Sequence, residues 1–325
     1  MKGCILTILF ISSCFKVFPQ NSYNVLVKKA DSLYHSKKFK ESLTFYTQAF
    51  ALKATNKTDL YNAACSAALS GEQEKAFNLL DEAMGKGWIN ILHLKKDPDL
   101  LSLHSSEEWT NLTEKMQRLG DKVEAQYDKP LQKELLEILE SDQTVRKEYL
   151  KAIDKFGNNA PIVDSLGNIV KHTDSLNLIR VTRILDEKGW LDKDKVGERA
   201  TQALFLVIQH SDLTTQEKYY PLMKKALKNG QLKASSLALL EDRMALRNGK
   251  RQMYGTQIYY DNKSKKYYVA PLDKPEEVDK RRLQVGLGLI TDYVKRWNIV
   301  WDIKNYESEL SKIELPNKIS VKERQ

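Results

Sequence analysis

Four side chains have the types needed for proton transfer, namely His210, Asp212, Asp142 and Asp242. An imidazole held by a carboxylate can act as a general base near neutral pH, because the carboxylate orients the ring. His210 has two candidate partners of this kind, Asp212 two residues away and Asp242 further along the chain. No serine or cysteine stands in a nucleophile motif, so the sequence names no covalent catalyst.

The candidate residues also suit two other kinds of chemistry, the stabilisation of negative charge and the binding of a metal. Arg243 or Arg281 could stabilise negative charge, and the backbone at Gly255 could let a ligand approach. A metal is an alternative, because His210, Asp212 and Asp142 are all recognised ligand types. A single histidine in the last turn of a helix is more often a partner of the helix dipole, so we expect no metal and no cofactor.

The stretch that positions many of these groups is residues 237–257. Its helix is apolar around much of its circumference, so Asp242 and Arg243 are expected in or near a core, where charged groups require partners. Asn248-Gly249 predicts the end of this helix, and a turn around Gly255 follows. Residues of this stretch and of other segments are predicted to bind a ligand. They are Arg146, Gln209, Arg243, Gln252, Tyr254, Gly255, Gln257, Arg281 and Arg282.

Asp142 lies on the apolar seam of a predicted helix that starts near Leu131. Three explanations remain open. Ser141 or Asp142 could be an N-cap where a helix restarts, or Asp142 could pair with Arg146 one turn on. The third explanation is a functional acid that faces a shared pocket.

The elements that must carry these residues form a mainly α domain over residues 121–300. Periodic apolar positions predict helices over 162–188, 196–209, 214–229 and 233–247, with an interruption at His172-Thr-Asp174. Tyrosine-rich runs at 258–261 and 266–270 predict a small β-hairpin. Further helices are expected from Pro275 and through Asp292, and residues 301–325 are expected to be a charged, frayed tail.

The N-terminal domain, residues 21–120, shows a spacing of 34 residues. Positions 30, 33, 42, 46 and 49 recur as small or larger apolar residues at 64, 67, 76, 80 and 83, which resembles the tetratricopeptide repeat. Two such repeats bury too little surface alone, so residues 88–119 are expected to pack as a degenerate third unit. The alternative is that they form a linker.

The first 20 residues have the apolar run of a secretory signal, which is too short to span a bilayer. Simple export is the expectation, and a lipoprotein anchored through Cys14 is the alternative. Removal of the signal leaves Cys65 as the one thiol, with no disulfide framework. A buried, inert Cys65 is expected over a nucleophile, because it lies in an alanine-rich run.

Composition narrows the classes of partner. The chain has 325 residues, 42% hydrophobic and 29% charged, which indicates folded globular domains, and its length favours two of them. The net charge is +9, but the basic residues are spread along the chain without the aromatic interleaving that stacks bases. We therefore expect no nucleic-acid partner.

The second domain also resembles a domain family of unknown function found in exported proteins of Bacteroidetes-type bacteria. The resemblance spans about residues 130–297, and its most specific motif is Gln252-x-Tyr254-Gly255-Thr256-Gln257. Its other pieces are Asp142-Gln143-x-x-Arg146, Gly189-Trp190, Gln209-His210-x-Asp212, Asp242-Arg243 and Val278-Asp279-x-Arg281-Arg282. The family implies candidate residues but no reaction.

Three functional hypotheses follow. The first is a cell-envelope binding or scaffolding protein whose repeats hold a peptide or protein. The second is an envelope hydrolase or related enzyme that uses His210, Asp212, Asp142 and Asp242. In the third, these polar residues only fix the fold. The first is preferred, because neither domain shows a nucleophile.

Overall fold

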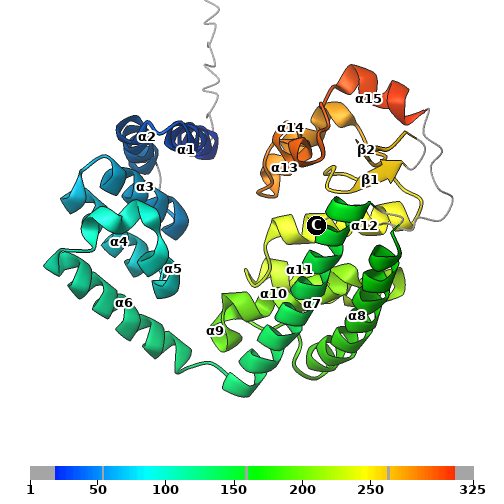
Figure 1. The fold of residues 1–325 in the computed structure, drawn as a ribbon, viewed down its shortest axis with the longest axis horizontal. Coiled ribbons are helices and arrows are strands. Elements are labelled where there is room, and N and C mark those ends of the chain that lie inside the picture. The colour runs from blue at the N-terminus through cyan, green and yellow to red at the C-terminus, as the bar shows by residue number, and fades with distance from the viewer. Residues whose placement is uncertain (1–18, 53–54, 158–159, 262–263, 312–325) are drawn as a thin grey trace, which may run out of the picture. The chain divides into compact units, whose positions relative to one another are not determined.

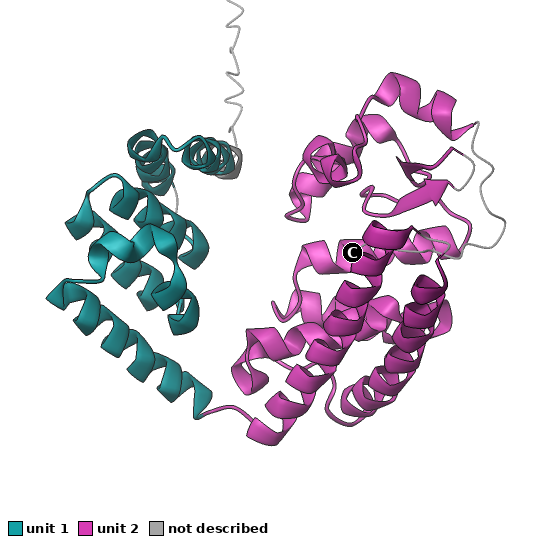
Figure 2. Ribbon diagram, in the orientation of Figure 1, with its two compact units in different colours: residues 1–125 teal, residues 126–325 magenta. Residues whose placement is uncertain are grey.

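The computed structural model describes residues 19–52, 55–157, 160–261 and 264–311 (Figure 1). The chain divides into two compact units, residues 1–125 and 126–325 (Figure 2). Helices make up most of both units, and the described residues contain a single two-stranded sheet. The prediction of a mainly α fold with a small hairpin is confirmed. The predicted signal covers residues 1–20. Residues 1–18 of it, which include Cys14, lie outside the described residues.

Unit 1 is built from helix pairs. Its elements are α1 (Pro19–His35), α2 (Phe39–Leu52), α3 (Lys57–Leu69), α4 (Gln73–Gly85), α5 (Ile91–Lys96), η1 (Pro98–Leu103) and α6 (Glu107–Glu124). Helix α1 packs on α2, and α3 packs on α4. Small residues that recur at the 34-residue spacing, such as Ala30, Ala64 and Ala76, are fully buried, because close helix crossings leave no room for larger side chains.

The segment after α4 belongs to the same core. Leu94, Leu100, Leu103 and Met116 are fully buried with the residues of the helix pairs. The segment is therefore a packed part of unit 1, and the linker alternative for residues 88–119 is wrong. Ser106 caps α6, because its hydroxyl oxygen accepts from the Trp109 amide at 3.1 Å.

Unit 2 begins with a helical body. Its helices are α7 (Lys129–Phe156), α8 (Pro161–Lys188), α9 (Lys193–Val196), α10 (Glu198–His210), α11 (Leu213–Lys228) and α12 (Ala234–Arg247). Helices α7, α8 and α10 contact one another in pairs, and their apolar faces share one core. One predicted helix break and one alternative, an N-cap at Ser141 or Asp142, are absent. Helix α8 runs without interruption through His172 and Asp174, and α7 runs through Asp142, which excludes an N-cap there.

The rest of unit 2 surrounds a hairpin. Strand β1 (Ile258–Asp261) pairs antiparallel with β2 (Lys266–Val269), with Ile258 opposite Val269. The short helices that follow are η2 (Pro275–Glu277), α13 (Val278–Gln284), α14 (Ile290–Val294), η3 (Lys295–Trp297) and α15 (Ile303–Leu310). Their apolar side chains form a second core with the hairpin.

The expected frayed tail is wrong for residues 303–310. They form α15, whose Tyr306 and Leu310 are buried in the second core. The Tyr306 hydroxyl donates to the carbonyl oxygen of Ala270 and accepts from the Leu272 amide, both at 2.8 Å. Among the described helices, none is long and apolar enough to cross a membrane.

Candidate functional site

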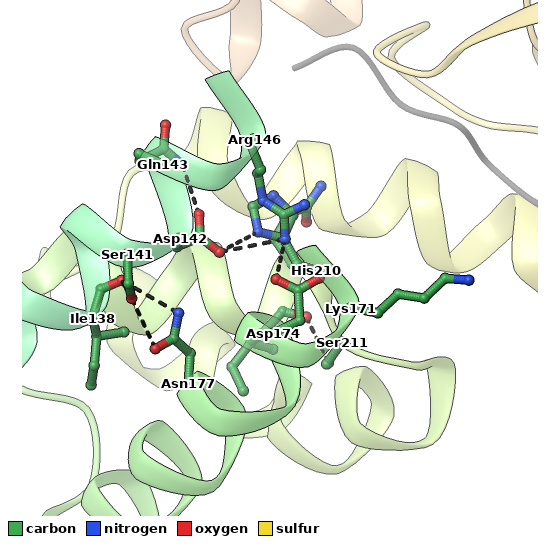
Figure 3. A network of polar contacts seen from close by, with 12 residues as sticks. Ile138, Ser141, Asp142, Gln143, Arg146, Lys171, Asp174, Asn177, His210 and Ser211 are labelled. Atoms are coloured by element: carbon green, nitrogen blue, oxygen red, sulfur yellow. Dashed lines mark hydrogen bonds and ion pairs between the residues drawn. The ribbon is translucent and has the colours of Figure 1, made fainter. Parts of the chain in front are cut away.

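Three helices of unit 2 bring together Asp142, Arg146, Asp174 and His210, which we call the histidine cluster (Figure 3). His210 Nδ1 lies 2.9 Å from Asp142 Oδ1. Arg146 Nη2 donates to Asp174 Oδ1 at 2.6 Å and reaches Asp142 Oδ1 at 3.4 Å. A cation therefore lies between the two carboxylates, and an imidazole contacts one of them.

The helices themselves explain this meeting. Asp142 follows Leu135, Ile138 and Leu139 along the buried face of α7, so its carboxylate is carried into the core and is 1% exposed. His210 is the last residue of α10, a helix buried on several sides. Asp174 lies halfway along α8 and reaches Arg146 from its own helix.

The pKa values of the two acids of the histidine cluster, Asp142 and Asp174, are shifted in opposite directions. Burial works against ionisation of Asp142, yet the hydrogen bond and charge of His210, with Arg146 and Gln143, hold its pKa below the usual value. Burial raises the pKa of Asp174, and the nearby charge of Asp142 adds to this against the pull of Arg146. Ionisation is therefore favoured at Asp142 and opposed at Asp174.

An ionised Asp142 decides how His210 is protonated. A carboxylate only accepts hydrogen bonds, so Nδ1 must carry the hydrogen between them. Nε2 is then the ring nitrogen that can accept a hydrogen bond or a proton.

His210 also lines a pocket of about 260 Å³. The other lining residues are Lys171, Asp174, Ser175, Leu178, Val207, Ser211 and Asp212. Ser211 donates its hydroxyl hydrogen to the carbonyl oxygen of Ile208 at 2.8 Å, so it is not set up as a nucleophile. Asp212 caps α11, since its Oδ1 accepts from the Thr215 amide at 2.8 Å.

A metal competes with Arg146 for this place. Asp142, Asp174 and His210 can each offer one ligand atom, and these atoms lie within 4.8 Å of one another. The guanidinium of Arg146 already hydrogen bonds to both carboxylates and neutralises part of their charge. Arg146 thus already supplies one cation to both acids of the histidine cluster.

The second group of predicted residues surrounds residues 252–257, which we call the glycine turn. Asp242, fully buried, accepts hydrogen bonds from the backbone amides of Met253, Tyr254 and Thr256, and from the Thr256 hydroxyl. Burial raises the pKa of Asp242, and these hydrogen bonds oppose the rise. Its carboxylate holds the backbone of the glycine turn and has no contact with His210 among its hydrogen bonds in the described chain.

Arg243 and glutamine side chains form a further set of hydrogen bonds at the glycine turn. Arg243 Nη1 donates to the carbonyl oxygen of Gln209 at 2.6 Å, and its Nε reaches Gln257 Oε1 at 3.4 Å. Gln252 accepts from the Gln257 amide at 2.9 Å and donates to the carbonyl oxygen of Ala270 at 2.8 Å. All four side chains are at most 5% exposed, so they satisfy one another and the backbone.

Arg281 and Arg282 also donate hydrogen bonds to the backbone of the glycine turn. Arg281 Nε donates to the carbonyl oxygen of Met253, and Arg282 Nη1 donates to that of Tyr254, each at 2.7 Å. Gly255 has φ +65°, and a β-carbon there would lie 2.7 Å from Ile290 Cδ1. The expectation that a ligand approaches Gly255 is therefore replaced by a packing explanation.

Within the described part of the chain, hydrogen bonds and ion pairs divide the sequence candidates into two groups. His210, Asp142 and Arg146 form the histidine cluster, and Asp212 lies on its pocket. The remaining candidates, Gln209, Asp242, Arg243, Gln252, Tyr254, Gly255, Gln257, Arg281 and Arg282, build the glycine turn. Gln209 joins the groups, because it precedes His210 on α10.

Two charged residues that line the pocket, Lys171 and Asp174, are not among the sequence candidates. The sequence analysis predicts a helix break at Asp174, which the continuous α8 contradicts. A signal for Asp174 existed: Val163, Asp174 and Leu185 are eleven residues apart, which places an acid on the buried face of an unbroken helix.

Cys65 behaves as the inert alternative. It is buried, with Sγ 3.8 Å from Asp97 Oδ2. Burial raises the pKa of the thiol, and the charges of Asp97 and Asp99 raise it further. A thiolate is disfavoured here, so a nucleophilic role is not supported.

Comparison with known proteins gives two family matches. Residues 129–305, more than half of the chain, match the model of a family of unknown function, DUF6624. Residues 22–124 match a model described as an A/B hydrolase-like, N-terminal domain. No curated protein and no solved structure matches the chain.

Proposed function

The chain belongs to the family of unknown function DUF6624, and from its histidine cluster we propose that unit 2 binds a small polar molecule and carries out general acid–base chemistry of the hydrolase type. The observation that carries the proposal is the 2.9 Å contact between His210 Nδ1 and Asp142 on the wall of a pocket. A buried carboxylate on one ring nitrogen orients the other for proton transfer.

The acid half of this chemistry falls to Asp174. His210 Nε2 takes a proton from water, and the hydroxide adds to the electrophilic atom of the substrate. Asp174, whose pKa is raised by burial, gives its proton to the leaving group as the bond to that group breaks. Water is the nucleophile in this proposal because Ser211, the hydroxyl next to His210, is bonded to Ile208.

A second candidate function concerns unit 1. The buried small residues at a 34-residue spacing support a tetratricopeptide-like unit, which would hold a peptide or protein partner. The match to an A/B hydrolase-like, N-terminal domain is compatible with a partner domain beside an enzymatic one. Export by the apolar N-terminal run, or anchoring through Cys14, is part of the same proposal.

The test is a panel of chromogenic esters, amides, glycosides and phosphate esters, assayed with the whole protein. His210→Gln and Asp174→Asn should each lower turnover by about 10²–10⁴-fold. His172→Gln is the matched control, because His172 is exposed on α8. Unfolding curves of every variant separate lost chemistry from lost fold.

Two results would remove the proposal. One is that the native protein turns over no member of the panel. The other is that turnover is retained in a folded His210→Gln variant. The scaffold function of unit 1 is tested separately, by comparing the partners that native protein and variants of unit 1 capture in a pull-down.

A further inference from the structure

A second pocket lies in the hairpin region of unit 2, away from the residues of the histidine cluster. It has a volume of about 210 Å³ and lies between β2, residues 299–302 and α15. Its lining includes Tyr267, Val300, Trp301, Asp302, Tyr306 and Glu309. We call it the aromatic pocket.

The walls of the aromatic pocket are held in place. The rings of Trp301 and Tyr306 lie 5.1 Å apart at 46°. Tyr306 is fixed by its hydrogen bonds to Ala270 and Leu272, and Tyr267 packs on Tyr260 with ring centroids 4.8 Å apart. A ligand would thus meet preformed aromatic surfaces and order few side chains on binding.

The charge of the aromatic pocket is opposite to that of the whole chain. The chain carries +9, yet the charged residues that line this pocket, within the described part of the chain, are Asp302 and Glu309. Asp302 accepts from the Lys304 amide at 2.9 Å and from Asn305 at 2.7 Å, which fixes its carboxylate at the start of α15. Arg251, whose charge reaches Tyr306, is not a lining residue and donates to the carbonyl oxygen of Leu272.

We propose that the aromatic pocket binds an organic cation of the alkylammonium class. Ring faces attract a cation through their negative quadrupole, and nearby carboxylates add to the attraction. Val300 and the other aliphatic lining residues suit the methyl groups of such a cation. The chemistry of the histidine cluster plays no part in this binding.

Tetramethylammonium chloride is the probe, titrated into the whole protein and followed by two-dimensional NMR. Shift changes should gather on residues 299–310 and Tyr267. Trp301→Phe should weaken binding several-fold, and Trp301→Ala by tenfold or more. Glu309→Gln should also weaken it several-fold. Glu276→Gln replaces an exposed acid on η2 that does not line the pocket, and this variant should bind like the native protein.

Sodium chloride at equal ionic strength and the neutral isostere neopentyl alcohol are the ligand controls. The proposal is overturned if millimolar tetramethylammonium produces no local shifts, or if neopentyl alcohol binds equally well. It is also overturned if a folded Trp301→Phe variant and Glu309→Gln both keep native affinity. The spectra of the free variants establish that each is folded.

Discussion

Asp142 is the residue on which the histidine cluster depends. It accepts hydrogen bonds from Gln143, Arg146 and His210 while it is almost completely buried. These partners offset the desolvation of its charge, so Asp142→Asn removes the negative charge that Arg146 and His210 share. The contribution of Asp142 to the free energy of unfolding should therefore depend on pH.

Replacement of Asp142 by Asn should lower the free energy of unfolding by about 3–5 kcal/mol at pH 7. The pKa of Asp142 is lowered in the folded state, so its contribution is present above the unfolded pKa of about 3.9. The contribution is lost as pH falls through the folded pKa. The difference between native and variant protein should therefore shrink below about pH 4 in urea titrations.

Asp164→Asn provides the control, because Asp164 is exposed on α8. It should change stability by less than about 1 kcal/mol. A constant loss for Asp142→Asn across the pH range would contradict a role for its charge.

At the scale of elements, the sequence predicted the elements that periodicity controls and missed those that long-range contacts control. The helices and hairpin of unit 2 follow from apolar spacing and tyrosine-rich runs. Asp174 lies within the unbroken α8, but its bond to Arg146 comes from another helix and could not be read from local sequence. The order of α15 depends on Tyr306 reaching Ala270 and Leu272. Such contacts have no local signal.

The candidate site was predicted in the same uneven way. The burial of Asp242 and Arg243 was correctly expected from the apolar helix around them. Their partners are backbone groups of the glycine turn and of Gln209, together with side-chain amides. His210 and Asp142 are 68 residues apart, so their pairing required the packing of α7 on α10.

The glycine turn gives a prediction for an element. Gly255→Ala should cost about 2–4 kcal/mol, since it combines positive φ with a contact against buried Ile290. Gly249→Ala should cost only about 1 kcal/mol, because its φ is +70° but no atom lies within 4 Å of an added β-carbon. Denaturant unfolding measures both.

Ile290→Val in the Gly255→Ala background should restore part of the loss by removing the contacting methyl group. If the two alanine variants are equally stable, packing against Ile290 does not explain Gly255.

At the scale of the whole molecule, the two units have separate hydrophobic cores. Each core is made from residues of one unit, so each unit should fold without the other. Fragments 1–125 and 126–325 should each show helical circular dichroism and a cooperative thermal transition. A fragment that stays unfolded alone would show that its stability depends on the other unit.

The arrangement of hydrogen between His210 and Asp142 is tested most directly by a long-range ¹H–¹⁵N correlation spectrum of the histidine side chains. We expect the His210 signal to show a hydrogen on Nδ1, and we expect the shift of that hydrogen to change in Asp142→Asn. A His210 ring with a bare Nδ1 that faces Asp142 would contradict the account, because the carboxylate would then not orient Nε2 toward a ligand.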